Sequence, residues 1–250
     1  MVIFRTILDK GGRNVCKTCD LILIRHEEVE GNLAGVKSFS GDNSGFTKDV
    51  VEKPSSEWPL TPNGHRESAR LGSWLRDALG SCNDFRFAVS PLRRAKETAI
   101  LALPEVSWED NYSLRGRLWG GIENTPRREW LDYCIKRGID HLPSGFHEAY
   151  PDGETMSEVW KRALSFLRDL QQKTVAVTHG EIIQMLRMII EAIPESSYRD
   201  LDRNGNYIRN GQIVWYSKFD PNTGECSPSF RFKRICFRDK DTGWFTLPAG

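Results

Sequence analysis

The stretch Leu21-Ile22-Leu23-Ile24-Arg25-His26 joins four consecutive apolar residues directly to a basic pair. Two similar apolar stretches follow along the chain, at Phe87-Ala88-Val89 and Val175-Ala176-Val177. A continuous apolar run is typical of a strand buried on both faces, because a half-exposed strand would alternate apolar with polar residues. The three stretches therefore predict central strands of one sheet.

Helical patterns separate these strands, and they begin near Thr61, Ser90, Thr155 and Gly180. The third pattern begins with Thr155 and Glu158, which have the spacing of a capping box. Strands that alternate with helices indicate an α/β fold. We expect a three-layer αβα arrangement, with a mainly parallel central sheet and helices on both faces.

Two long polar stretches, 33–59 and 120–153, match neither the strand pattern nor the helix pattern. Segments of this length inside a compact domain usually have a function, so we expect lid insertions. Residues 213–219 and 230–237 predict two strands joined by a turn, which we interpret as an edge hairpin. We expect residues 1–250 to form a single domain, with a core at 20–219 and a C-terminal extension at 220–250.

The balance of charge excludes several classes of partner. The 250 residues include 35 Lys and Arg against 34 Asp and Glu, which gives a net charge of +1. A chain that coats nucleic acid would be strongly basic, so we expect no nucleic-acid partner. The apolar runs are far shorter than the ~18 residues that span a membrane. We expect a soluble, cytoplasmic protein without a membrane partner. We consider a homodimer as its assembly.

The six cysteines are scattered, and only Cys16 and Cys19 form a Cys-x-x-Cys pair. A structural zinc site would need a second close pair, and Cys226 with Cys236 is a poor candidate. We therefore expect free thiols in a reducing compartment, no metal and no cofactor.

Polar residues follow each predicted central strand where it ends: Arg25-His26, Ser90 with Arg93-Arg94, and Thr178-His179-Gly180. Because the carboxyl ends of parallel strands lie at one edge of a sheet, these side chains are expected to share one pocket. Arginine forks and helix N-termini suit the oxygens of a phosphate group. Nearby arginines disfavour a proton on His26, so its neutral imidazole is able to attack phosphorus and form a phosphohistidine.

The sequence LILIRHEE at 21–28, with Asn32 shortly after, resembles the signature of the histidine phosphatase superfamily, in its phosphoglycerate-mutase-like first branch. Residues 90–95 are similar to the second phosphate-binding motif of this family, and His179-Gly180 is similar to its second histidine motif. The ordered motifs cover roughly residues 20 to 215. The resemblance implies that His26 is the nucleophile and that no metal is needed. It also implies a phosphoryl-binding set consisting of Arg25, Asn32, Arg94 and His179.

The sequence departs from the family pattern at two places. Glu27 stands where the family usually has a glycine after the nucleophilic histidine. The first branch has its proton donor, a glutamate, in a segment that resembles residues 114–120, and the donor position falls on Gly116. Loss of general acid catalysis slows a reaction by about 10²–10⁴-fold. Glu181 is the first candidate substitute, because His179-Gly180-Glu181 resembles the His-Ala-Glu donor motif of the second branch; Glu123 and Glu28 come next.

We therefore expect a histidine acid-type phosphatase, a phosphoric monoester hydrolase that acts on a small phosphorylated metabolite through phosphohistidine on His26. Two alternatives stay open. A phosphoglycerate-type mutase needs a site that excludes water, which the 120–153 insertion would supply. A catalytically weak pseudophosphatase that binds phosphorylated ligands is motivated by Gly116. The basic residues near Arg115 and Arg117 form either a solvated face or a clamp for a second anionic group.

Overall fold

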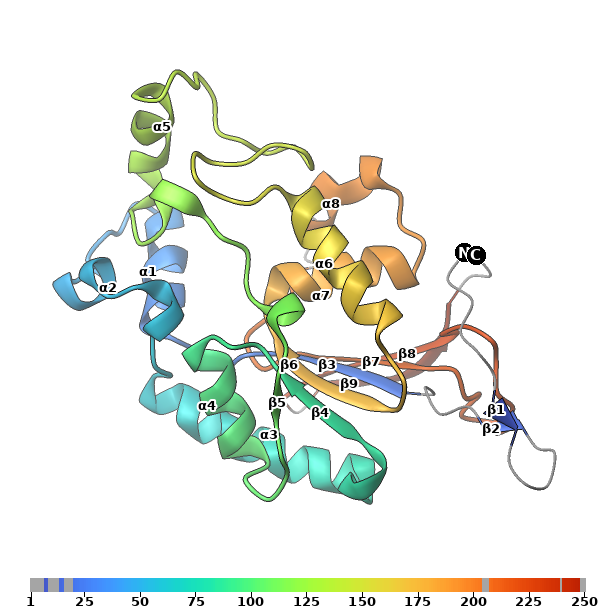
Figure 1. Ribbon diagram of the computed structural model, residues 1–250. Helices are drawn as coiled ribbons and strands as arrows, with labels where there is room; N and C mark the ends of the chain where they lie inside the picture. The colour runs from blue at the N-terminus through green and yellow to red at the C-terminus, as the bar shows by residue number, and fades with distance from the viewer. Residues whose placement is uncertain (1–6, 9–13, 16–19, 204–206, 239, 248–250) are drawn as a thin grey trace.

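Among the residues that the structure describes, seven strands form one mixed sheet in the order β5-β4-β6-β3-β7-β8-β9 (Figure 1). The parallel part consists of β5 (Glu109–Asp110), β4 (Arg86–Val89), β6 (Thr174–Thr178) and β3 (Asp20–Arg25). The antiparallel part consists of β7 (Ile213–Ser217), β8 (Phe232–Phe237) and β9 (Lys240–Thr246). A separate antiparallel pair is formed by β1 (Ile7–Leu8) and β2 (Asn14–Val15). This computed structural model describes residues 7–8, 14–15, 20–203, 207–238 and 240–247.

The three apolar stretches form the adjacent central strands β4, β6 and β3, as predicted. Alternate side chains of β3 enter different cores: Leu21 and Leu23 pack on one face of the sheet, and Ile22 and Ile24 on the other. All four side chains are fully buried. A strand covered on both faces has no position at which a polar side chain could reach water, which explains the continuous apolar run.

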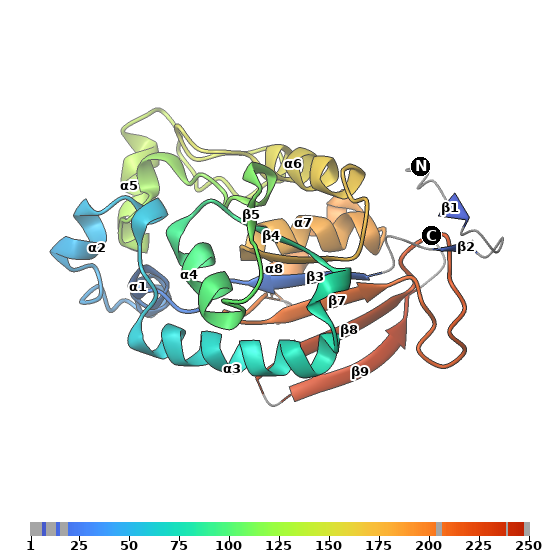
Figure 2. The same ribbon diagram turned by 60° about the horizontal axis from the view of Figure 1, so that its bottom comes forward.

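Helices cover both faces of the sheet (Figure 2), which confirms the three-layer prediction. The helices α6 (Met156–Arg168) and α7 (Gly180–Ile190) pack against the face that contains Leu21 and Leu23. The helices α3 (Pro62–Leu79) and α4 (Arg93–Ala102) pack against the opposite face.

Local sequence signals account for the ends of these helices. Thr61 accepts a hydrogen bond from the Gly64 N–H at 3.0 Å and caps α3, which ends at Gly80 with a φ of 65°. Thr155 and Glu158 form the predicted capping box at the start of α6. Each cap satisfies backbone N–H groups that have no partner within the helix.

Both predicted lid insertions contain helices, which the sequence patterns did not predict. The first contains most of α1 (Glu30–Phe39), then α2 (Lys48–Glu52) and the 3-10 helix η1 (Ser55–Glu57). The second contains η4 (Gly120–Ile122) and α5 (Arg127–Ile135). Helix α1 escaped prediction because it has no side-chain cap at Val29 and contains glycines in its first two turns. The remaining helical segments are η2 (Cys82–Asp84), η3 (Tyr112–Leu114), η5 (Glu195–Ser197) and α8 (Tyr198–Arg203).

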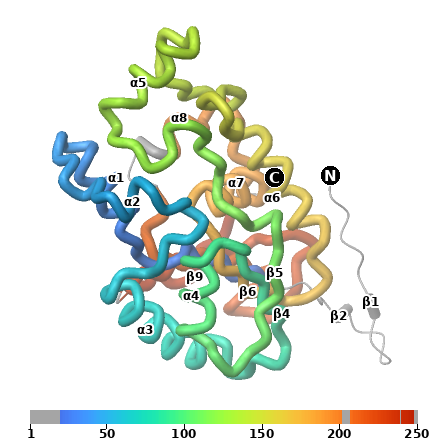
Figure 3. Tube along the Cα trace, turned by 60° about the vertical axis from the view of Figure 1, so that its left-hand side comes forward, coloured from blue at the N-terminus to red at the C-terminus, as the bar shows by residue number. Residues whose placement is uncertain are grey.

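The two insertions lie side by side at one end of the molecule, where α1 contacts α5 (Figure 3). The second insertion has a small core of its own, in which Ile122, Cys134 and Tyr150 are buried. Trp119 and Trp130 pack against this core, and their ring centroids lie 6.3 Å apart. The aromatic residues of the second insertion therefore hold it together.

The C-terminal prediction of an edge hairpin needs correction. Strand β7 pairs with the central strand β3, and β8 pairs with β7, so neither is the edge of the sheet. The edge is β9, which lies with β8 inside the predicted extension 220–250. Strand β9 was missed because it is mostly exposed and has no alternation of apolar and polar residues.

The packing of α3 gives a prediction about stability. Leu75 is fully buried in the core between α3 and the sheet, whereas Leu101 of α4 is 37% exposed. We expect Leu75→Ala to lower the free energy of unfolding by about 2–5 kcal/mol, because it removes buried methyl groups and leaves a cavity. Urea unfolding measures this change, with Leu101→Ala as the control. Equal losses in the two variants would contradict this packing.

Candidate active site

The carboxyl ends of the three central strands lie together and bring distant residues into contact. The backbone N–H of His26, after β3, donates to the carbonyl of Thr178 in β6 at 2.9 Å. The N–H of Ser90, after β4, donates to the carbonyl of Val177 at 2.9 Å. As a result, the rings of His26 and His179 lie with their centroids 5.0 Å apart.

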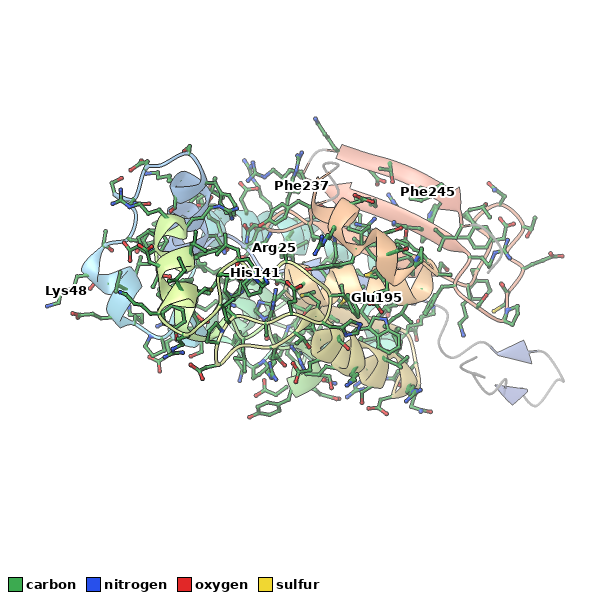
Figure 4. The ribbon with its side chains drawn as sticks, turned by 90° about the horizontal axis from the view of Figure 1, so that it is seen from above. Arg25, Lys48, His141, Glu195, Phe237 and Phe245 are labelled. Carbon is green, nitrogen blue, oxygen red and sulfur yellow. The ribbon has the colours of Figure 1, made fainter. Side chains whose placement is uncertain are left out.

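A cavity of about 310 Å³ opens above these strand ends, and we call it the phosphate cavity. Its lining includes all of the predicted site residues, namely Arg25, His26, Asn32, Arg94, His179 and Glu181. Figure 4 shows Arg25 near the middle of the molecule, with Lys48 of α2 toward one end and Phe245 of β9 toward the other. The structure therefore brings these six residues together at one cavity.

Hydrogen bonds determine which nitrogen of His26 is free to react. The Nδ1 atom lies 2.7 Å from the backbone carbonyl oxygen of Glu27. A carbonyl oxygen only accepts, so Nδ1 carries the proton and Nε2 holds a lone pair. The Nε–H of Arg94 donates to this Nε2 at 3.1 Å. An uncharged imidazole therefore faces the guanidinium group of Arg94.

Burial keeps both site histidines neutral. It lowers the pKa of His26 well below the usual 6.5, and the positive charges of Arg94 and Arg25 lower it further. It also lowers the pKa of His179 well below this value, with smaller contributions from Arg94, His26 and Arg25. Positive charge at the site therefore comes from the arginines.

The two arginines are held by backbone groups outside the sequence motifs. Arg94 Nη1 donates to the carbonyl of Ser55 at 2.7 Å, and Arg25 Nη1 donates to the carbonyl of Ile208 and to the hydroxyl of Tyr207. Burial lowers the pKa of Arg94 to about 10, although the nearby Glu181 and Glu123 raise it, so the group stays charged at neutral pH. No motif marks these contacts, because they depend on the folding of the first insertion and of the loop before β7.

Ser90 orients the second histidine. Its Oγ lies 2.7 Å from His179 Nε2 and accepts a hydrogen bond from the N–H of Leu92 at 3.3 Å. The hydroxyl is therefore able to donate its proton to Nε2, which assigns the ring proton of His179 to Nδ1. This Nδ1 and the Nε of Arg25 are both buried without a hydrogen-bond partner among the described residues. Unsatisfied donors of this kind are typical of a site that binds an acceptor.

Gly116 lies against the same cluster. A Cβ atom built on Gly116 would lie 3.3 Å from Arg94 Nη2 and 3.3 Å from His179 Nδ1. A side chain at this position would therefore begin inside the phosphate cavity, as the resemblance to the family's donor segment implies. The glycine leaves that space open.

A buried ion cluster fixes the segment that contains Gly116. Arg115 donates both Nη groups to Glu154, at 2.6 and 2.7 Å, and Arg162 donates to Glu154 at 3.0 and 3.1 Å. Arg162 also donates to the carbonyls of Ser113 and Arg115. Although burial raises the pKa of Glu154, the hydrogen bonds from Arg115 and Arg162 lower it to about 2. The carboxylate therefore stays charged and fixes the position of the segment.

The three candidate donor carboxylates are placed differently. Glu181, at the start of α7, and Glu123 both line the phosphate cavity. Glu123 accepts a hydrogen bond from Ser55 Oγ, whereas Glu181 has no hydrogen bond and no ion pair to any described residue. Glu28 lies outside the cavity lining and accepts from the hydroxyl of Thr61 at 2.8 Å. The geometry leaves Glu181 the least restrained of the three.

Glu27 replaces the usual glycine without entering the site. A Cβ on Gly211 would lie 1.9 Å from Glu27 Oε1, and Gly211 has a φ of 71°. The side chain lines a separate cavity that also contains Glu67 and Arg238. Burial, and next the charge of Glu67, raises the pKa of Glu27 to about 7. Because residue 211 is a glycine, the carboxyl group of Glu27 fits against it in this separate cavity.

Three further sequence predictions concern metal ligands, thiols and membranes. Cys82, Cys134, Cys226 and Cys236 are free thiols, and the Cys16 and Cys19 pair lies outside the described residues. Within the described ranges, His, Cys, Asp and Glu form no group of three or more that could hold a metal ion. No helix in the described part of the chain is long and apolar enough to cross a membrane.

Comparison with known proteins gives one family and a shared fold. The family model for the histidine phosphatase superfamily (branch 1) matches residues 21–215. No curated protein matches the sequence. The structure is similar to mycobacterial hydrolase 1, with 16% identity and a TM-score of 0.61 over 80% of this chain and 91% of that chain. It is similar to alpha-ribazole phosphatase from Shigella flexneri, with 19% identity and a TM-score of 0.59 over 84% and 96%.

A third similar structure is a mutant phosphoserine phosphatase from Entamoeba histolytica in complex with phosphoserine. It has 21% identity and a TM-score of 0.57, over 80% of this chain and 90% of that chain. At identities this low, the structural similarity shows a shared fold and does not extend to substrate or mechanism.

The neutral histidines predict a pH dependence of stability. Because the folded pKa of His26 lies below the unfolded value near 6.5, only the unfolded chain gains a proton there as the pH falls below 6.5. Stability is therefore greatest above pH 6.5 and decreases toward acid, by up to roughly 1.4 kcal/mol per pH unit for this residue. We expect His26→Asn to reduce the slope, as measured by urea unfolding in phosphate-free buffer between about pH 6.5 and 5.5.

The control for this prediction is a histidine whose pKa shifts the opposite way. A hydrogen bond with Asp140 raises the pKa of the exposed His141, so its contribution to stability grows as the pH falls. This contribution is complete below the unfolded pKa near 6.5, so His141→Asn should leave the slope between pH 6.5 and 5.5 nearly unchanged. If His26→Asn left the slope of the wild type unchanged, the neutral imidazole would be refuted.

Proposed function

The chain belongs to the histidine phosphatase superfamily, branch 1, and on that premise we propose that it is a metal-independent phosphomonoesterase acting through phosphohistidine on His26. Membership supports phosphatase activity in general. The proposed substrate is a small phosphorylated metabolite, and the proposed products are its alcohol and inorganic phosphate.

The observation that carries this proposal is the tautomer of His26. The hydrogen bond from Nδ1 to the carbonyl of Glu27 leaves the Nε2 lone pair beside Arg94. Arg25 Nε and His179 Nδ1 supply unpaired donors at the same cavity. A phosphoryl group held by these donors would face a nucleophile that needs no deprotonation, and the two arginines would balance its charge.

The proposed reaction has two steps, and Glu181 transfers a proton in both of them. In the first step, the Nε2 lone pair of His26 forms a bond to phosphorus, the bond from phosphorus to the ester oxygen breaks, and that oxygen takes a proton from Glu181. In the second step, water attacks the phosphohistidine and gives a proton to the Glu181 carboxylate, which releases inorganic phosphate and neutral His26. The residue that serves as acid in one direction serves as base in the other.

We assign the role of proton donor to Glu181 rather than Glu123 for two reasons. Glu181 follows His179 by two residues at the N-terminus of α7, so its backbone is fixed next to the phosphoryl-binding groups. Glu123 accepts a hydrogen bond from Ser55, the residue whose carbonyl holds Arg94, which ties it to the positioning of that arginine.

A second candidate function is that of a catalytically weak protein that binds phosphorylated ligands. The geometry of Gly116 favours it, because the position faces Arg94 and His179 and offers no proton. If Glu181 does not replace the family's donor, phosphorylated ligands would bind while alkyl esters would turn over slowly.

The phosphohistidine is open to direct test. After rapid mixing with p-nitrophenyl phosphate and quenching in base, we expect one phosphoryl group on His26 that is stable to base and labile to acid. Peptide mass spectrometry locates the group. His141→Ala, which changes an exposed histidine outside the cavity, should retain it, and His26→Ala should lose it. An unlabelled wild-type chain that nevertheless releases phosphate would refute the intermediate. With a phosphoglycerate in place of p-nitrophenyl phosphate, an isomerised product without free phosphate would indicate a mutase.

The proton donor gives a separate prediction. We expect Glu181→Gln to lower the rate at which an alkyl phosphate phosphorylates His26 by about 10²–10⁴ and to affect the rate of phosphorylation by p-nitrophenyl phosphate little, because nitrophenolate leaves without a proton. Glu195→Gln, an exposed carboxylate paired with His147, serves as the control. We expect Gly116→Glu to restore much of the activity lost in Glu181→Gln. A gain of 10² or more from Gly116→Glu in the wild-type background would instead support the weak-enzyme candidate.

A further inference from the structure

The phosphate cavity continues into a second cavity of about 550 Å³. The two share lining residues that include Arg25, Trp119 and Glu181. We call the second cavity the aromatic vestibule, because five aromatic residues line it: Phe39, Trp119, Trp130, Tyr198 and Tyr207. A phosphoryl group bound at His26 would leave the rest of its substrate facing this space.

Two arginines hold the aromatic walls of the vestibule in place. The guanidinium of Arg117 lies 4.7 Å from the ring centroid of Trp119, and that of Arg25 lies 4.9 Å from the ring centroid of Tyr207. Cation–π contacts of this kind restrict the rings at the boundary between the two cavities. Rings fixed in this way present flat apolar surfaces to a ligand at little cost in conformational entropy.

The arginines beside the vestibule are held by other residues. Arg115 is bound through both Nη groups to Glu154, and Arg117 Nε donates to the backbone carbonyl of the same residue at 2.8 Å. The charge of Arg115 is therefore balanced by a carboxylate, whereas Arg117 is fixed by a neutral carbonyl and keeps its charge. The described residues that line the two cavities include no lysine. The vestibule wall therefore offers five aromatic side chains and two arginines, Arg25 and Arg117.

Gln184 adds one polar group to the vestibule wall. It lies three residues after Glu181, which places both on one face of α7, and its side-chain nitrogen is buried without a partner among the described residues. An unpaired buried donor is unfavourable. A hydrogen-bond acceptor on a bound ring would satisfy this nitrogen.

We infer that the substrate is the phosphomonoester of an alcohol with one flat aromatic group. The inference rests on the proposed function for the position of the phosphoryl group, and it adds the class of alcohol. The phosphoryl group occupies the cavity at His26, and the aromatic group lies in the vestibule between Trp119 and Tyr207.

Phosphonates test this inference without depending on turnover, because their carbon–phosphorus bond is not hydrolysed. Calorimetric titration of the full chain should give a Kd for benzylphosphonate about tenfold below that for ethylphosphonate. Binding of 2-carboxyethylphosphonate should be weaker than that of benzylphosphonate. Equal binding of the benzyl and ethyl compounds, tightest binding of the carboxylate, or no binding of any of them would overturn the inference.

Variants locate the preference in the vestibule. Trp119→Leu and Phe39→Leu should each reduce the ratio between benzyl and ethyl binding, and Phe39 is 64% exposed, so its replacement does not threaten the fold. Trp108→Leu, a partly buried tryptophan outside both cavities, should keep the ratio. A ratio unchanged in both vestibule variants would overturn the inference. Failure to phosphorylate His26 would refute the proposed function alone, since these titrations need no reaction.

Discussion

The hydrogen bond between His26 Nδ1 and the carbonyl of Glu27 is the interaction on which the site depends. It places the lone pair on Nε2 and directs it toward Arg94 and the cavity. The bond exists because the chain turns directly after β3, and the N–H of His26 is held by Thr178 of the neighbouring strand. The sheet therefore does more than bring residues together, since the ends of its strands determine the protonation pattern of His26.

The charged groups around His26 would repel one another if both histidines were protonated. Two arginines and two histidines share a buried space, and four charges of one sign could not be accommodated there. Burial resolves the conflict by keeping both imidazoles neutral, so that the positive charge comes from arginines, of which Arg94 and Arg25 act on both histidines. The carboxylate of Glu154 balances part of the charge of Arg115 and Arg162 while it fixes the segment at Gly116.

The parts of the fold that follow from local rules were predictable. The strands β3, β4 and β6 show in the sequence because complete burial demands apolar residues, and α3 and α6 show because their caps are local. The convergence of His26, Arg94 and His179 was predictable, because the carboxyl ends of parallel strands lie at one edge of a sheet. Helix α1 and strand β9 were not predictable, because tertiary contacts stabilise them and their sequences have no periodic apolar pattern. The partners of Arg25 and Arg94 come from loops, whose positions no local signal specifies.

Gly116 and the aromatic vestibule are related through the chemistry of the leaving group. A glutamate at position 116 would matter most for an alkoxide, which leaves slowly unless it is protonated. A phenolic oxygen has a pKa near 10 and leaves far more readily as its anion. If the ring bound by the vestibule is attached directly to the ester oxygen, the reaction needs less acid catalysis, and a glycine becomes compatible with efficient turnover. For such an ester the aromatic walls and the glycine at position 116 are compatible, and protonation by Glu181 matters mainly for alkyl esters.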